Sequence, residues 1–173
     1  MGYEKMDPAI HELLDKKACE EVLMRYSRTL DWLDYPGQSS CFWPDADIDY
    51  GFLKSDPAGW LDKLKDIESG SARRWHMTAN SLIKIDGGNA FAESYTLAVG
   101  TSEENGQLIN TLFGGRFLDD FEKRGQEWRI SKRIYLCDWS CQAPDQNHVL
   151  ISEENPLNTL GPLAPGHASY RPM

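Results

Sequence analysis

The feature that most constrains the fold is a run of four β-prone segments in the second half of the chain. Short turn signals, each containing glycine, separate the segments near Asp86, Glu103 and Lys123. Asn105–Gly106 is the strongest of these signals, because both residues tolerate the positive φ of a tight hairpin turn. Since each segment is joined to the next by a short turn, we expect an antiparallel meander of long strands.

A glycine pair lies inside the third of these segments. Gly114 and Gly115 interrupt a strand pattern, and glycines in a strand interior are typical of a bulge or bend. A bulge increases the local twist of a strand and bends it. The sheet is therefore predicted to be curved rather than flat.

The first half of the chain has the pattern of helices. Apolar residues recur at three- and four-residue spacing from Lys16 to Leu33, which predicts an amphipathic helix that ends at Tyr35–Gly37. A second, shorter helix is predicted to begin at Pro57, with Ser55 or Asp56 as its N-cap. The alternation in "DADIDYGF" predicts a strand between the two helices. Helices followed by a curved antiparallel sheet indicate an α+β domain, with the sheet wrapped into a cone around a pocket.

Size, charge and cysteine content exclude several classes of protein. A length of 173 residues suits one domain, and a net charge of −9 argues against a general nucleic-acid surface. No apolar run approaches the roughly 20 residues of a membrane span, and the N-terminus lacks an apolar signal core. Cys137 and Cys141 have no second pair to complete a metal site, so no metal is expected. We therefore expect a soluble cytoplasmic protein that binds neither nucleic acid nor a membrane.

The end of the chain differs in composition from the rest. Five of the nine prolines fall in the last 30 residues, which disfavours a helix or an inner strand there. We therefore predict an N-terminal extension over residues 1–14, a domain over 15–142 and a Pro-rich tail over 143–173. The tail is either loose, or it crosses a neighbouring subunit or covers the pocket mouth. The tail contains three leucines that favour its docking on a protein surface over a loose tail, namely Leu157, Leu160 and Leu163.

The last β-prone segment, "EWRISKRIYLCDW", carries information about the pocket. Its alternation predicts one aliphatic face, which includes Trp128, Ile130, Ile134 and Leu136. The other face combines an arginine with large aromatic side chains, which is how ligand cavities are commonly lined. Its members are Arg133, Tyr135, Cys137 and Trp139. The alternative is that Arg133 pairs with an acidic residue at an oligomer interface.

One histidine, His76, lies in the interior of the chain at the start of a predicted strand. It could be a packed core residue, a metal ligand without companions, or a general base. Two acidic candidates, Asp31 and Asp34, lie at the end of the first helix, where the helix dipole disfavours carboxylates. Solvated surface positions are the default interpretation for both. A helical wheel places Asp31 away from Val22 and Tyr26, so only fraying of the helix end would turn it inward.

Several short stretches together resemble a known family. They are Tyr26 and Asp31 in "RYSRTLDWLD", Tyr50 in "DIDYG", His76 in "RRWHMTANS", and the ending "GGRFLDDFEKRGQEWRISKRIYLCDW". Their order and spacing over Asp15–Gln142 resemble the nuclear-transport-factor-2-like superfamily. The most similar branch is the SnoaL-like one, which includes scytalone dehydratase, hexachlorocyclohexane dehydrochlorinase and the bile-acid 7α-dehydratases.

The resemblance implies a cone-shaped fold and a site for elimination without a metal or cofactor. It implies that Asp31 and His76 are a catalytic pair in which the histidine is the base, since a neutral imidazole accepts a proton near neutral pH. It also gives catalytic positions to Tyr26, Tyr50 and Arg133. Residues expected to bind the substrate are Tyr135, Trp139, Trp43, Phe113 and Asn80.

The predicted function is a cofactor-independent lyase acting on a small hydrophobic substrate, aromatic or alicyclic. Three alternatives stay open on the same fold. They are a lyase that releases formaldehyde from lignin-derived diaryl compounds, a polyketide cyclase or isomerase, and a non-catalytic small subunit of a ring-hydroxylating dioxygenase. A strand that is apolar on both faces must be shielded from water on both, and this domain has few helices to do so. We therefore predict a homo-oligomer. The resemblance favours a trimer, with a dimer second.

Overall fold

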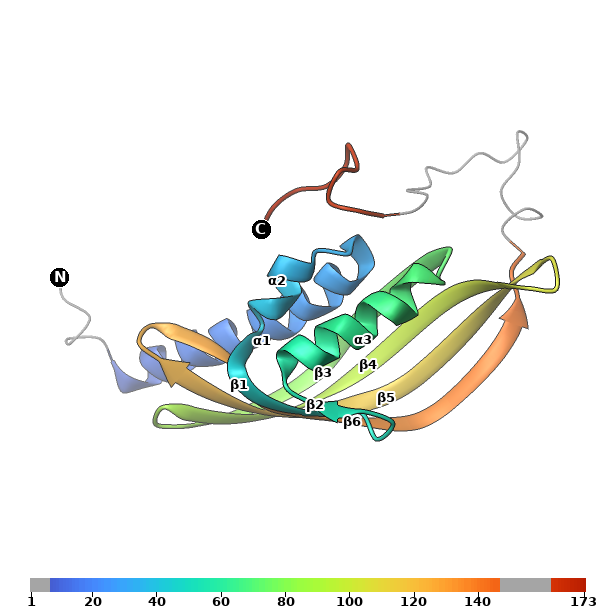
Figure 1. Ribbon diagram of the computed structural model, residues 1–173. Helices are drawn as coiled ribbons and strands as arrows, with labels where there is room; N and C mark the ends of the chain where they lie inside the picture. Colours follow the sequence, from blue (N-terminus) through green and yellow to red (C-terminus); the bar gives the residue numbers. More distant parts are fainter. Residues whose placement is uncertain (1–6, 147–162) are drawn as a thin grey trace.

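The computed structural model describes residues 7–146 and 163–173. Three helices lie against one face of a curved sheet of six strands (Figure 1). The helices are α1 (Pro8–Trp32), α2 (Tyr35–Ser39) and α3 (Pro57–Ser69). The strands are β1 (Phe42–Asp49), β2 (Lys54–Ser55), β3 (Arg73–Asp86), β4 (Asn89–Glu104), β5 (Gln107–Arg124) and β6 (Glu127–Pro144). The predicted α+β architecture, a sheet curved around a pocket beneath helices, is confirmed.

The long strands form the predicted antiparallel meander. In the sheet order β2-β1-β6-β5-β4-β3, the four long strands β3 to β6 are neighbours, and β1 pairs in parallel with β6. Positive φ is present where the sequence predicted it, at Asn105 (52°) and Gly106 (79°), and also in the other two predicted turns, at Gly87 (58°) and Gly125 (69°). Backbone geometry that few residue types tolerate therefore fixes where each strand reverses.

The glycine pair of β5 lies at an irregularity in the sheet, as predicted. The register between β5 and β6 shifts between Gly114 and Gly115. A Cβ atom on Gly114 would collide with the Trp139 ring, and one on Gly115 would collide with the Leu136 carbonyl oxygen. Both positions require glycine because β6 approaches closely there.

A second irregularity overturns the predicted facing of β6. The β5–β6 register shifts again between Asp120 and Phe121, and Ser131 is the extra residue on β6. A one-residue bulge exchanges the faces of everything beyond it. Ile130 and Arg133 are therefore both fully buried on the inner side, while Leu136 is 44% exposed. The prediction of one continuous aliphatic face was wrong.

Helix α1 is longer than the apolar periodicity predicted. It begins at Pro8, where the Asp7 side chain accepts a hydrogen bond from the Ala9 backbone N–H, and it ends at Trp32. Leu33, with a φ of 53°, is its left-handed C-cap. The predicted extension of residues 1–14 thus overlaps the first turns of α1, and residues 1–6 lie outside the described part.

Helix α3 begins as predicted. Pro57 is its first residue, and the Asp56 carboxylate accepts from the Gly59 backbone N–H at 2.8 Å. Trp60 and Leu64, one turn apart, are buried against the sheet. Across the described ranges, no helix is both long and apolar enough to span a membrane.

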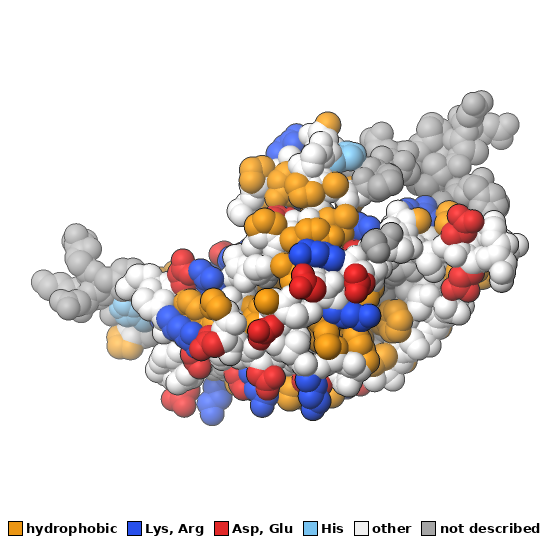
Figure 2. All heavy atoms as spheres, in the orientation of Figure 1, with side chains coloured by type: hydrophobic (Ala, Val, Ile, Leu, Met, Phe, Trp, Pro, Cys, Tyr) orange, Lys and Arg blue, Asp and Glu red, His pale blue; other side chains and the backbone are white. Residues whose placement is uncertain are grey.

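The described end of the tail lies on the helical layer, on the side away from the sheet (Figure 1). His167 and Tyr170 pack against Trp32, and the Tyr170 hydroxyl donates to the Asp34 carboxylate at 2.7 Å. Figure 2 shows this segment as a raised group of hydrophobic and basic side chains. Leu157 and Leu160, which favoured docking of the tail, lie outside the described residues.

Candidate active site

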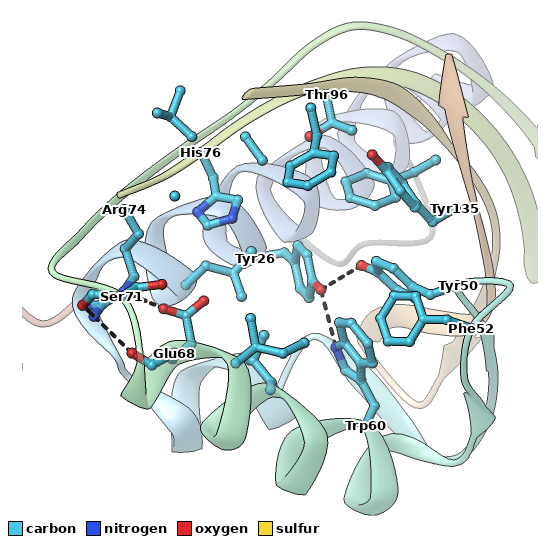
Figure 3. A pocket seen from close by; sticks show the side chains of 18 residues that line it. Tyr26, Tyr50, Phe52, Trp60, Glu68, Ser71, Arg74, His76, Thr96 and Tyr135 are labelled. Carbon is cyan, nitrogen blue, oxygen red and sulfur yellow. Dashed lines mark hydrogen bonds and ion pairs between the residues drawn. The ribbon is translucent and has the colours of Figure 1, made fainter. Parts of the chain in front are cut away.

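A cavity of about 270 Å³ lies between α1, α3 and the inner face of the sheet. Its two ends differ in chemistry (Figure 3). One end is aromatic, and the residues that form it are Tyr26, Tyr50, Phe52, Trp60, Phe117 and Tyr135. The other end holds most of the polar groups, which are Glu68, Ser71, Arg74 and His76. A substrate with an apolar ring and one polar group matches this division.

Two tyrosine hydroxyls meet at the aromatic end. The Oη atoms of Tyr26 and Tyr50 lie 2.8 Å apart, and the Trp60 indole N–H donates to Tyr26 Oη at 3.3 Å. The Tyr50 ring is stacked between Trp60 and Tyr135, at centroid distances of 3.9 and 5.1 Å. Because stacking and hydrogen bonds fix both rings, their hydroxyls have defined positions at the cavity wall.

Burial keeps both hydroxyls protonated. It raises the pKa of Tyr26 and raises that of Tyr50 well above its ordinary value, and the proximity of Tyr26 adds to the shift at Tyr50. A phenol that stays neutral can donate a hydrogen bond to charge that develops on a substrate oxygen or halide.

Asp31 and His76 form a hydrogen-bonded pair behind the cavity. His76 Nδ1 lies 2.8 Å from Asp31 Oδ1, and the two side chains are 17% and 14% exposed. One turn earlier on α1, the Ser27 hydroxyl lies 2.7 Å from that of Thr78, so two adjacent pairs connect the helix to β3. No fraying is needed for Asp31 to reach inward, because α1 continues through Trp32 and β3 passes along this side of it.

This hydrogen bond determines which nitrogen of His76 is available for chemistry. An ionised carboxylate only accepts, so its partner Nδ1 carries the ring proton. The lone pair is then on Nε2. His76 lines the cavity, whereas Asp31 does not. The carboxylate holds the imidazole in one tautomer and orientation, which is the form in which a histidine can act as a base.

The polar end contains a buried ion pair between α3 and β3. Glu68 Oε2 pairs with Arg74 Nε, and the two side chains are 6% and 7% exposed. Arg74 Nη2 also donates to the backbone carbonyl oxygens of Ser71, at 3.1 Å, and of Glu68, at 3.4 Å. Burial raises the pKa of Glu68, and the positive charge of Arg74 opposes that shift.

Arg133 lies outside the cavity lining, which corrects its predicted place at the substrate. It is fully buried, and its Nε and Nη2 atoms each donate to Asp119 at 2.7 Å. Its guanidinium lies 4.2 Å from the Tyr26 ring centroid and 3.9 Å from that of Phe117. Burial disfavours its charge, but Asp119 outweighs that effect and raises the pKa of Arg133. The pair thus supports two rings of the cavity from beneath.

Three of the five predicted substrate-binding residues also lie elsewhere. Trp139 is 50% exposed beside Gly114, on the opposite face of β5 from Phe113. The Trp43 indole donates to the Glu122 carbonyl oxygen, and Asn80, with a φ of 51°, lies at a register shift of β3. The register shift between Gly114 and Gly115 explains the error at Trp139, because alternation along β6 cannot be extended past an unrecognised bulge.

Phe113 and Tyr135 do line the cavity, as predicted, and so do Tyr26 and Tyr50. Sequence reasoning missed the contributions of Trp60, Phe117, Glu68 and Arg74. The apolar side predicted for the second helix contained the signal for Trp60, since a large aromatic on the inner side of a short helix faces whatever lies beneath it. No local pattern marks Glu68 as a partner of Arg74.

Within residues 7–146 and 163–173, no group of three or more His, Cys, Asp or Glu side chains is arranged to hold a metal ion. The sequence predicted neither a metal nor a cofactor, and that expectation stays a prediction.

Comparison with known sequences identifies a domain family. Residues 11–134 match the model of the SnoaL-like domain. An uncharacterized protein of Mycobacterium tuberculosis strain H37Rv is 28% identical over 131 residues, which cover 73% of this chain and 87% of that protein.

Comparison with solved structures identifies the fold. A candidate scytalone dehydratase from Novosphingobium aromaticivorans superposes with a TM-score of 0.68 at 16% identity, covering 91% of this chain and 97% of that one. A type 3 hexachlorocyclohexane dehydrochlorinase from Novosphingobium barchaimii superposes with a TM-score of 0.69 at 18% identity, covering 79% and 94%.

Proposed function

The chain belongs to the SnoaL-like domain family, and from this premise we propose that it is a lyase whose Asp31–His76 pair eliminates a small leaving group from a hydrophobic substrate. Structural neighbours that carry the names of a dehydratase and a dehydrochlorinase support lyase chemistry. The observation that carries the proposal is the 2.8 Å contact between Asp31 Oδ1 and His76 Nδ1, beside a cavity whose far end is aromatic.

In the proposed reaction, His76 Nε2 takes a proton from a carbon of the substrate. The electron pair of the broken C–H bond forms the new double bond, and the bond to the leaving group breaks with its electrons. Asp31 stabilises the imidazolium that results. In a dehydration, the imidazolium returns its proton to the departing hydroxide, which leaves as water, so the enzyme ends in its starting state.

The aromatic end has two roles in this proposal. Tyr50, Trp60 and Tyr135 form a stacked aromatic wall against which an aromatic or alicyclic ring packs, which orients the C–H bond toward His76. In the Tyr26–Tyr50 pair one hydroxyl donates its proton to the other, and the second hydroxyl donates its own proton to the leaving group or to an enolate-like oxygen as negative charge develops there. Arg133 acts indirectly, by fixing the Tyr26 ring.

The test begins with a screen of aromatic and alicyclic alcohols and halides for turnover by mass spectrometry. With a substrate found, His76→Ala should lower kcat by about 100-fold or more, the range of a lost general base. His11→Ala, which changes a histidine outside the cavity lining, is the matched control and should leave kcat unchanged. Dialysis against EDTA without added nucleotide or flavin should leave wild-type activity intact. A His76→Ala enzyme with near-normal kcat would overturn the proposal.

A further inference from the structure

The Glu68–Arg74 pair has no part in the elimination described above, although both side chains line the cavity. Buried ion pairs are costly, because two charges lose their hydration. This one lies at the polar end, on the same stretch of wall as His76. Its position at the cavity raises the question of what it does to a ligand.

Arg74 is not available to bind an anionic ligand. Its Nε atom is paired with Glu68, and its Nη2 atom donates to two backbone carbonyl oxygens, that of Glu68 in the last turn of α3 and that of Ser71 in the loop before β3. The side chain is 7% exposed. Its charge is neutralised by a carboxylate, and its Nε and Nη2 groups face protein oxygens. It therefore does not present two adjacent free donors as the open fork that recognises a substrate carboxylate.

Glu68, in contrast, keeps accepting capacity toward the cavity. The ion pair engages Oε2, and Figure 3 shows the second carboxylate oxygen directed away from Arg74, toward the cavity interior. A carboxylate has about four lone-pair sites, and the pair with Arg74 Nε uses one of its oxygens. The oxygen at the cavity can accept a hydrogen bond from a ligand.

We propose that Glu68, held in place by Arg74, accepts a hydrogen bond from a hydroxyl group of the ligand, and so selects neutral alcohols and phenols over carboxylates of the same shape. The proposal deepens the proposed function and rests on it, because it names the substrate class of the same cavity. A ligand hydroxyl gains a charge-assisted hydrogen bond at this position. A ligand carboxylate meets a like charge in a poorly hydrated site.

The geometry also orients such a ligand. With its hydroxyl on Glu68 at the polar end and its ring among Tyr50, Trp60 and Tyr135, the bound molecule spans the cavity past His76. A site built to bind a hydroxyl rejects analogues that lack one, because its buried acceptor is then left unpaired. Glu68 is thus a specificity-determining residue.

The test measures binding of 2-naphthol and 2-naphthoate by titration calorimetry, which needs no turnover. Wild-type protein should bind the phenol about tenfold more tightly than the carboxylate, the scale of one charge-assisted hydrogen bond. In Glu68→Gln the negative charge is lost and Arg74 loses its partner, so the preference should disappear or reverse. Asp62→Asn removes the same charge from an exposed site on the same helix and should keep the wild-type preference.

Two outcomes would overturn the inference. One is a wild-type protein that prefers 2-naphthoate, and the other is a Glu68→Gln variant that keeps the full preference for 2-naphthol. If Glu68→Gln does not fold, the double variant Glu68→Leu/Arg74→Leu removes both charges together, a change that buried pairs often tolerate. Retention of the preference in that variant would also refute the inference. Because binding is read without catalysis, these results are independent of the kcat of His76→Ala.

Discussion

His76 Nδ1 lies 2.8 Å from Asp31 Oδ1, so that a strand residue and a helix residue 45 positions apart in the chain form one unit. Ser27 and Thr78 form a second contact one helical turn away, at 2.7 Å. The imidazole is therefore oriented by a carboxylate on an element that is itself fixed to the sheet.

Asp31→Asn should lower kcat by about 100-fold, because the amide keeps the size of the carboxylate but cannot stabilise an imidazolium. Asp34→Asn is the matched control, three residues further along the chain. Asp34 caps α2 and accepts from Tyr170, without contacting His76. Steady-state kinetics should therefore separate the two aspartates, and equal effects of both changes would contradict the assignment.

Glu68 should make the stability of the protein depend on pH. Burial raises the pKa of its carboxyl in the folded state, and the negative charge of Asp31 adds to that shift, while the positive charge of Arg74 opposes it. A raised pKa means that the folded protein binds this proton more tightly than the unfolded chain. The protonated Glu68 side chain therefore contributes its full stabilisation below the pKa of glutamate in the unfolded chain, about 4.3. This contribution is lost as pH rises through the higher pKa of Glu68 in the folded protein.

The unfolding free energy of the wild type minus that of Glu68→Gln should accordingly decrease as pH rises from about 4 to about 8. Urea unfolding at several pH values measures it. The exposed Asp62→Asn change should give a difference that varies little over the same range. If the difference in unfolding free energy between wild type and Glu68→Gln increased with pH instead, the pKa of Glu68 would be lowered by folding, and the prediction would be wrong.

Removal of one member of the Arg133–Asp119 pair should destabilise the fold. Both side chains are fully buried, so Asp119→Asn leaves an uncompensated charge and should cost about 3 to 5 kcal/mol in urea unfolding. The double variant Arg133→Met/Asp119→Leu should recover most of that loss. Arg124→Ala, which breaks an exposed pair with Asp45, should change stability little. If Asp119→Asn lowered the free energy of unfolding only slightly, the negative charge of Asp119 would not be needed to compensate the buried Arg133.

The four cysteines should react in two classes. Cys19 and Cys41 are buried, and burial raises their pKa values to about 12 and about 11, whereas Cys137 and Cys141 are exposed. A thiol reacts as its thiolate. Ellman's reagent near pH 8 should therefore titrate the two exposed thiols in the folded protein and all four in guanidinium. The variant Cys137→Ser/Cys141→Ser should show no fast reaction.

The outer face of the sheet should associate with further copies of the chain. Trp75 and Met77 alternate with inward-facing His76 and are 49% and 42% exposed, and Trp139 on β6 is 50% exposed. Apolar area of this kind on a sheet is typical of an interface. Light scattering should give a trimer, or else a dimer, which Met77→Glu converts to monomer. Leu13→Glu, on exposed α1 surface, should leave the assembly intact, and a wild-type monomer at micromolar concentration would refute the prediction.

Local chemistry made most of the fold predictable from the sequence. Asn105–Gly106 and the cap at Asp56–Pro57 require particular backbone geometry, and that geometry is present at both places. The helix start was missed because Asp7 and Pro8 precede the apolar periodicity. The facing of β6 was missed because a one-residue bulge at Ser131 leaves no compositional mark.

The site was predictable only in part. Tyr26, Tyr50 and His76 line the cavity, and Asp31 reaches His76, as the resemblance implied. Arg133 was misplaced because its partner, Asp119, lies on a neighbouring strand. Pairings between distant residues, such as Glu68 with Arg74, depend on how the elements pack and have no signature in either local segment.

Tyr26, Trp60 and Phe117 belong to the buried core and to the cavity wall at once. A mutation that reshapes this wall for a different molecule therefore also removes packing from the core, and most of its carriers would fold poorly. Phe52 and Phe113 line the same cavity but are 65% and 39% exposed. In proteins that descend from this one, substitutions should therefore accumulate first at exposed cavity positions such as Phe52 and Phe113. The buried aromatic residues Tyr26, Trp60 and Phe117 should change last.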